Sequence, residues 1–159
     1  MPFKLPLLAL TILALALAGC GSSTESTESD SAATAPKPLT KAALISKADA
    51  ICKSMQVKLD EIPPPESIED LEAAIGKQIE VSGPAIKKLA ALVPPEDLAA
   101  KYDAWTAKLE ELQAGTVRVR EAAGDGSQAQ VQKVIEEVDQ VNTKADEIGK
   151  QIGFKVCVK

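Results

Sequence analysis

The sequence predicts an all-α protein: an up-down-up-down four-helix bundle whose second helix is kinked or split near Pro84. Apolar residues recur every three or four positions across residues 40–152, as on one face of an amphipathic helix. Proline or glycine residues divide this region into four stretches, and such short connections make neighbouring helices run antiparallel. No stretch shows the strict apolar–polar alternation of a half-buried strand.

The first predicted helix begins after Thr40, a residue type that caps helix N-termini. It ends at the three consecutive prolines 63–65, because proline lacks an N–H group and clashes with the preceding turn. Its apolar face repeats at spacings of three and four: Leu44, Ala48, Ile51, Met55, Leu59 and Ile62.

The second predicted helix begins after Ser67, with acidic residues in its first turn, where the helix dipole favours them. Pro84 lies inside this run and leaves the carbonyl of Glu80 without its helical partner, which predicts a kink or a split. A break that reorganised this helix would give a long three-helix arrangement instead. The apolar face comprises Ile68, Leu71, Ile75, Ile79, Ile86, Leu89 and Val93.

The third predicted helix starts at Pro95-Glu96-Asp97, because proline at the first helical position followed by acids is typical of a helix start. Its apolar residues form a heptad seam: Leu98, Tyr102, Trp105, Leu109, Leu112, Thr116, Val119 and Ala123.

The fourth predicted helix follows a short turn over residues 123–127 and ends at Gly153. Its apolar face is again spaced by three and four: Val131, Val134, Val138, Val141, Ala145, Ile148 and Ile152.

The length and composition of the chain exclude several classes of function. A chain of 159 residues is too short for two ordinary domains, and a net charge of −5 argues against nucleic acid as a partner. The absence of histidine excludes histidine-based metal sites, Ser-His-Asp triads and Cys-His pairs. Aromatic residues make up only 3%, so the core must be mainly aliphatic.

The first residues are typical of a secretory signal. Met1–Lys4 carries one positive charge, and the apolar run Leu5–Leu17 that follows is shorter than the roughly 20 residues of a membrane span. The run ends in Leu17-Ala18-Gly19-Cys20, which resembles the lipobox of bacterial lipoproteins. That resemblance implies cleavage between Gly19 and Cys20 and a diacylglyceryl group on the Cys20 thiol. The alternative is an ordinary secretory signal with an incidental cysteine.

Three segments follow from this reading: a cleaved signal peptide at 1–19, a lipidated tether at 20–39, and a helical domain at 40–159. The tether is rich in Ser, Thr and Glu and cannot bury enough apolar surface to fold. We expect the chain to be exported, anchored to the cell membrane by the lipid on Cys20, and exposed outside the cytoplasm.

Two further cysteines, Cys52 and Cys157, are an even number in an exported chain, so a disulfide between them is expected. A reactive thiol pair is the alternative, but there is no CxxC spacing and no histidine to lower a thiol pKa.

A wider resemblance in layout rests on Ala48-Asp49-Ala50-Ile51-Cys52, two proline-rich breaks, and the Gly153-to-Cys157 spacing. Across residues 17–159 the chain is similar in these features to uncharacterised small helical lipoproteins of actinobacteria. The resemblance implies an exported, disulfide-pinned helical domain at the cell envelope, and it supplies no activity.

No motif indicates catalysis or a metal. The acidic pairs Glu110-Glu111 and Glu136-Glu137 fall beside the apolar seams and are typical of solvated helix faces. No glycine-rich phosphate loop is present, and no serine has a visible base partner. We therefore expect no enzyme activity and no cofactor or metal beyond the covalent lipid.

Three residues are candidate ligand contacts. Tyr102 and Trp105 share one helix face, either as core anchors or as an aromatic wall for a ligand. Ser82 lies at the Gly83-Pro84 break, which would open a polar pocket within the bundle.

Two main hypotheses of function remain. In the first, the domain is a non-catalytic interaction or structural module that binds an unknown envelope protein. In the second, it is a ligand-binding or sensor bundle that holds a small apolar molecule or lipid between the Pro84 kink and Trp105. A hydrolase is a third and weaker hypothesis, since it needs a buried, charge-perturbed group in a cleft. We expect a monomer.

Overall fold

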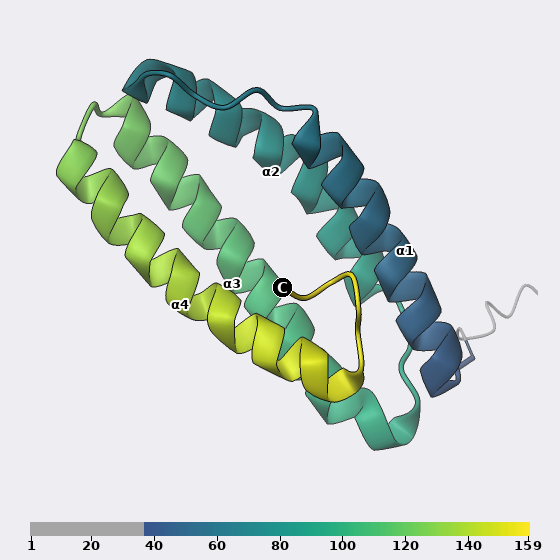
Figure 1. Cartoon of the computed structure of the whole chain (residues 1–159). Helices are drawn as coiled ribbons and strands as arrows, with labels where there is room; N and C mark the ends of the chain where they lie inside the picture. Colours follow the sequence, from purple (N-terminus) through teal and green to yellow (C-terminus); the bar gives the residue numbers. More distant parts are fainter. Residues whose placement is uncertain (1–36) are drawn as a thin grey trace, which may run out of the picture. The chain divides into compact units, whose positions relative to one another are not determined.

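The computed structural model describes residues 37–159, so the predicted signal peptide, Cys20 and nearly all of the tether lie outside the described residues. The described part is all-α and contains no strand. It contains four α-helices, labelled in Figure 1, and one short 3-10 helix: α1 (Lys41–Asp60), α2 (Ile68–Ala90), η1 (Glu96–Leu98), α3 (Ala99–Gly124) and α4 (Gln128–Ile152). The prediction of an all-α fold with four helices is confirmed.

Helix boundaries follow local capping chemistry. The hydroxyl oxygens of Thr40 and Ser67 accept from the backbone N–H groups of Ala43 and Asp70, at 3.2 and 3.1 Å, and cap α1 and α2. Ser127 caps α4 in the same way. Gly153 ends α4 in the left-handed conformation, with φ of 109°, which glycine adopts without strain.

The start of the third helix differs from the prediction. Pro95 has an extended backbone and precedes the helical turn, which begins as the 3-10 helix η1 and becomes α-helical at Ala99. A short 3-10 turn is a common way to begin an α-helix.

Pro84 does not split α2. The helix runs without interruption from Ile68 to Ala90, so the predicted split and the three-helix alternative are both wrong. Proline removes one helical hydrogen bond, but packing fixes the residues around it, since Ala85 and Leu89 are buried. Packing contacts with the rest of the domain thus outweigh the tendency of proline to break the helix.

The helices differ in length, and α1 extends along only part of the domain. At 1.5 Å per residue, the 20 residues of α1 span about 30 Å, against about 39 Å for the 26 residues of α3. Figure 1 shows α1 beside the C-terminal part of α2, while the loop 61–67 leads on to the start of α2. One end of the domain therefore contains all four α-helices, and the other end is built from α2, α3 and α4.

Two hydrophobic cores correspond to these two ends. The "aromatic core" comprises Leu44, Ala48, Cys52, Leu89, Leu98, Tyr102, Trp105, Ala145, Ile152 and Phe154. The "aliphatic core" comprises Ile75, Val119, Ala122, Ala123, Val131 and Val134. Between them α3 and α4 approach closely at Gly115, where an added methyl group would lie only 2.5 Å from Val138 Cγ2.

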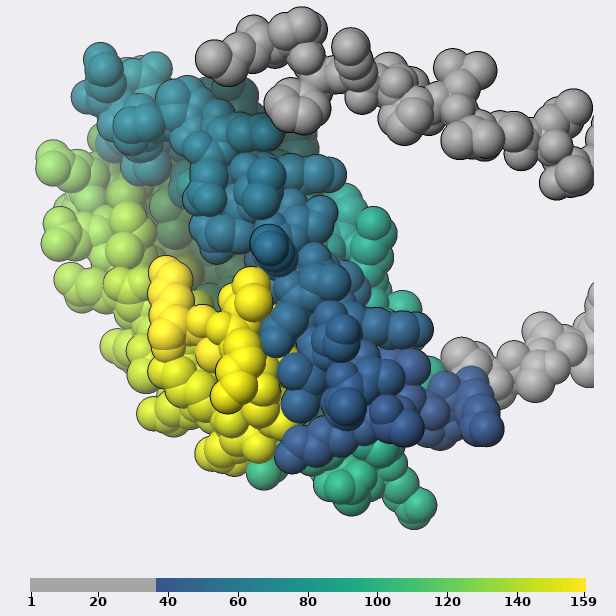
Figure 2. Space-filling model, turned by 45° about the vertical axis from the view of Figure 1, so that its right-hand side comes forward, coloured from purple at the N-terminus to yellow at the C-terminus, as the bar shows by residue number. Residues whose placement is uncertain are grey.

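Residues 153–159, which we call the C-terminal strap, return from the end of α4 and lie between α4 and α1 (Figures 1 and 2). A disulfide joins Cys157 of the strap to Cys52 of α1, with Cα atoms 5.3 Å apart, and confirms the predicted pairing. The two cysteines are 105 residues apart in the sequence. Closing a loop of this length stabilises the fold by roughly 4–5 kcal/mol in the chain-entropy model.

Residues 37–159 belong to one compact unit. Both cores and the disulfide lie within residues 37–159, so we expect a chain shortened to those residues to keep these packed elements and to fold on its own. No helix among these residues is long and apolar enough to cross a membrane.

Candidate ligand-binding cleft

A cleft of about 350 Å³ lies between the four helices and the C-terminal strap. The helices supply most of its apolar wall, and the strap supplies Val156 and Val158. Polar side chains also line it, among them Gln56, Ser82, Gln113, Thr116, Asn142 and Asp146. The apolar helix residues on the wall are Met55, Leu59, Ile86, Leu89, Trp105, Leu109 and Leu112.

The structure brings two of the three candidate contact residues together. Ser82 and Trp105 both line the cleft, whereas Tyr102 is not among the lining residues. Tyr102 is 1% exposed, and its hydroxyl donates to the carbonyl of Leu89 at 2.6 Å. Its ring centroid lies 5.6 Å from that of Trp105 and 6.4 Å from that of Phe154. The structure therefore places Tyr102 behind the cleft as a packed core residue.

Burial of Tyr102 also affects its ionisation. Loss of solvation raises the pKa of its hydroxyl well above the usual value, because the phenolate would be buried without water. The neutral hydroxyl is an additional donor to the Leu89 carbonyl in the last turn of α2, which also accepts from the backbone N–H of Leu92 at 3.0 Å.

Trp105 is the largest side chain of the aromatic core and is also 1% exposed. Its ring centroid lies 4.6 Å from that of Phe154 on the strap. Its indole Nε1–H has no hydrogen-bond partner among the described residues, although a buried indole usually finds one. This unpaired donor sits in a residue that lines the cleft.

Gly149 on α4 makes room beside this donor. A methyl group there would lie 2.6 Å from Val158 Cγ1 and 3.2 Å from Trp105 Nε1. The absence of a side chain therefore lets the strap and the indole nitrogen converge over the same backbone position of α4. Nothing in the sequence pattern alone distinguishes Gly149 from a surface glycine.

Ser82 links α2 and α3 across the cleft wall. Its hydroxyl oxygen lies 2.7 Å from the carbonyl oxygen of Gln78 and 2.7 Å from Oε1 of Gln113. A hydroxyl has one proton, so Ser82 donates to one of these acceptors at a time. Gln113 lies beside the apolar seam, and sequence reasoning did not single it out.

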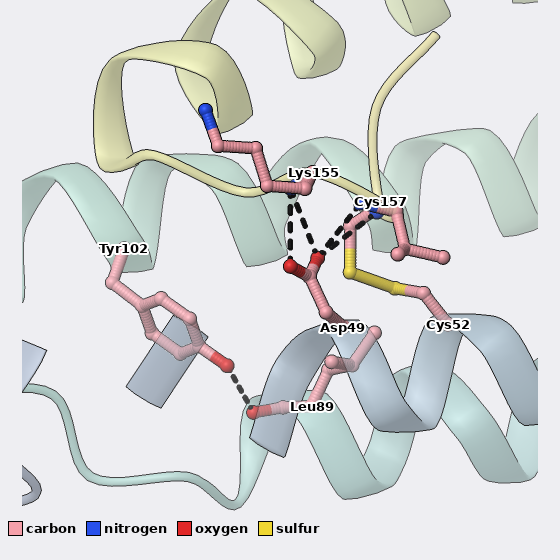
Figure 3. The surroundings of a disulfide bond; sticks show 7 residues. Asp49, Cys52, Leu89, Tyr102, Lys155 and Cys157 are labelled. Carbon is pink, nitrogen blue, oxygen red and sulfur yellow. Dashed lines mark hydrogen bonds between the residues drawn. A yellow bond between two sulfur atoms is a disulfide. The ribbon is translucent and has the colours of Figure 1, made fainter. Parts of the chain in front are cut away.

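Asp49 holds the strap in place, as Figure 3 shows. Its carboxylate accepts hydrogen bonds from the backbone N–H groups of Lys155, Val156 and Cys157, at distances of 3.0 to 3.2 Å. Asp49 precedes Cys52 by three residues, so the carboxylate and the disulfide lie on the same face of α1. That spacing is the one signal in the sequence from which this role could have been inferred.

The acidic pairs lie away from the cleft. Glu111 accepts a hydrogen bond from the Lys108 ammonium, which lowers the pKa of Glu111. Arg118 Nη1 lies 2.8 Å from Glu137 Oε2, and both side chains are substantially exposed. Among residues 37–159, no three His, Cys, Asp or Glu side chains gather in a way that would hold a metal ion.

Comparisons with known protein families, with curated proteins and with solved structures found no match to this chain. The function is therefore argued from the cleft itself.

Proposed function

We propose that the protein is a lipid-anchored, extracytoplasmic and non-catalytic binding module, whose up-down-up-down bundle holds a small apolar ligand in the cleft. The observation that carries the binding role is the cleft of about 350 Å³ beside Trp105. The anchor rests on the lipobox-like residues 17–20 and on the cysteine at position 20.

The dimensions and chemistry of the cleft support a ligand. Ligand pockets in proteins occupy about 300–1,000 Å³ and combine an apolar wall with a few polar groups that set orientation. Leu109 and Leu112 are only half-buried in the cleft wall, and their apolar surface would be covered by an occupant. Ser82 and Gln113 supply polar groups on the facing helices.

Native mass spectrometry of residues 37–159, exported from the protein's own host, tests this proposal. We expect an extra mass that disappears on denaturation. Leu109→Phe and Leu112→Phe enlarge side chains on the cleft wall and should abolish that mass. Ile135→Phe, on an exposed position of α4 outside the cleft, is the matched control and should retain it. A bare chain in every sample would contradict ligand binding.

The anchor is tested separately. Cys20→Ala in the full chain removes the lipid-accepting thiol, so the protein should leave the membrane fraction or accumulate unprocessed. Incorporation of labelled fatty acid should fall to background. Unchanged fractionation and labelling would contradict lipidation at Cys20.

A second candidate function is binding of an envelope protein at the end of the domain that contains the aliphatic core. A groove of about 750 Å³ lies there, with an apolar floor of Ile68, Leu71, Val131 and Ile135, and Ile135 is 41% exposed. A photo-crosslinking residue at Ile135 should then capture one partner, and the same residue at Val57, which is 54% exposed on α1, should not. Equal capture at both positions would argue against a specific surface.

A further inference from the structure

We infer that the ligand is an uncharged single-chain amphiphile, and that its oxygen accepts a hydrogen bond from Trp105 Nε1–H when Val158 of the C-terminal strap moves aside. This inference rests on the proposed binding function and names the ligand class and the gate of the same cleft.

The indole donor of Trp105 is buried without a hydrogen-bond partner among the described residues. Trp105 is 1% exposed, and its Nε1–H lacks any acceptor among residues 37–159. A buried donor that has given up water without gaining a protein acceptor is unfavourable, and such groups are rare in folded proteins. An oxygen atom supplied by a ligand would complete this site.

The C-terminal strap places Val158 close to this donor. Val158 lines the cleft, and its Cγ1 atom and the indole nitrogen both lie near the same point above Gly149. Val158 belongs to a non-helical segment and is only half-buried. It can therefore be displaced at lower cost than a helical side chain of the wall.

The strap is fastened more strongly before Val158 than after it. Asp49 and the disulfide hold residues 155–157, and both contacts precede Val158 along the chain. Beyond the disulfide, the backbone N–H of Lys159 donates to Asp146 at 3.2 Å. When this one hydrogen bond breaks, the end of the strap can swing about Cys157 while the disulfide stays intact.

The ligand class follows from the lining. A hydrocarbon chain fits the wall formed by Met55, Leu59 and Ile86, with Leu109 and Leu112 opposite. Lys159 is the one cation among the lining residues, and Asp146 lines the cleft as well. An anionic head group placed at the indole would lose its water inside a cleft that the Asp146 carboxylate also lines, which is costly, so an uncharged hydroxyl or carbonyl oxygen is favoured.

The experiment uses the fact that Trp105 is the only tryptophan in the chain. Residues 37–159 labelled with ¹⁵N therefore give a single indole N–H resonance in a proton–nitrogen correlation spectrum. Titration with 1-decanol should shift that resonance downfield and slow its exchange with water. Decanoate should bind more weakly, and n-decane should bind without the downfield shift.

A strap variant tests the gate. Val158→Ala removes the methyl groups near the indole nitrogen and should tighten 1-decanol binding roughly 3- to 10-fold, because less of the population is in the covered form. Val57→Ala, the same substitution on an exposed position of α1, should leave the affinity unchanged.

The possible failures are distinct. Absence of binding by all three probes would overturn the proposed function together with this inference. Binding of 1-decanol without movement of the indole resonance would overturn the hydrogen bond alone and leave the binding function standing. Decanoate binding as tight as 1-decanol would overturn the uncharged ligand class. Equal affinities for Val158→Ala and the unsubstituted chain would overturn the gate.

Discussion

The two ends of the helical domain are packed differently; we call them the aromatic end and the aliphatic end after the cores that they contain. The aliphatic end packs three helices around small side chains, Val119, Ala122 and Ala123 of α3 against Val131 and Val134 of α4. The aromatic end must also attach α1, which packs chiefly on α2. There the strap lies between α1 and α4 (Figure 1), contributes Phe154 to the aromatic core, and is joined to α1 by the disulfide. Helix packing alone suffices at one end, whereas the other depends on a covalent bond.

Removing the disulfide should cause the largest loss of stability, and the loss should be concentrated at the end of the domain that contains the aromatic core. Cys52→Ser combined with Cys157→Ser should lower the free energy of unfolding by roughly 4–5 kcal/mol. Native-state hydrogen exchange should show loss of protection first in α1 and in the strap, with the α3–α4 amides of the aliphatic core affected last. Uniform loss of protection along the chain would contradict the division into two ends.

Substitutions at two glycines test whether the strap yields more easily than a helix. At Gly115 a new methyl group meets Val138, a side chain of α4, so Gly115→Ala should destabilise the domain by about 1–3 kcal/mol in urea unfolding. At Gly149 the new methyl group meets Val158 of the strap. Because the strap can yield, Gly149→Ala should cost less than Gly115→Ala. The reverse order would show that the strap is as rigid as a helix.

Asp49→Asn should weaken the aromatic end selectively. The substitution replaces one carboxylate oxygen by an NH₂ group and removes the charge that strengthens three backbone hydrogen bonds, with an expected cost of about 1–2 kcal/mol. Asp139→Asn, at an exposed position in the middle of α4, is a control for removal of an acidic charge outside the strap. Urea unfolding measures both, and equal costs would argue against a special role for Asp49.

Alkaline pH should also act through the aromatic end, since Tyr102 is the only tyrosine. Burial raises its pKa in the folded state, so the unfolded chain releases this proton first. The contribution of Tyr102 to stability is therefore complete below about pH 10 and falls by roughly 1.4 kcal/mol per unit above it. In unfolding curves measured between pH 9 and about pH 11, Tyr102→Phe should remove this fall in the free energy of unfolding. Phenolate absorbance that appears at its ordinary pH in the folded chain would contradict the buried hydroxyl.

The smallest effect is expected at the exposed ion pair of α3. The hydrogen bond from Lys108 lowers the pKa of Glu111, but both groups are in contact with solvent. Glu111→Gln should leave the thermal midpoint unchanged within error at neutral pH, in low and in high salt. A clear decrease would indicate that this pair belongs to a larger network.

Much of the fold could be predicted because the signals are local. Thr40, Ser67, Ser127 and Gly153 set helix ends through contacts within a few residues, which sequence patterns record. The Cys52–Cys157 pairing followed from the number of cysteines. The continuity of α2 through Pro84 was missed, because packing on neighbouring helices outweighs the local cost of proline.

The candidate site was predicted less completely. The heptad seam placed Trp105 correctly on the inner face of α3, but the same pattern could not separate Tyr102, which is fully packed, from a residue at the cleft. Phe154 packs on Trp105, and Val158 approaches Gly149, only because the chain folds back after Gly153. No periodicity within one helix contains that information.

The disulfide also determines how the domain would respond to mechanical force. Cys52 and Cys157 enclose α2, α3 and α4 completely, so tension applied to the two ends of the chain passes from α1 through the sulfur–sulfur bond to the last residues. Only the segments outside this covalent ring can extend. Stretching would therefore peel off the first part of α1 and leave the other three helices unloaded.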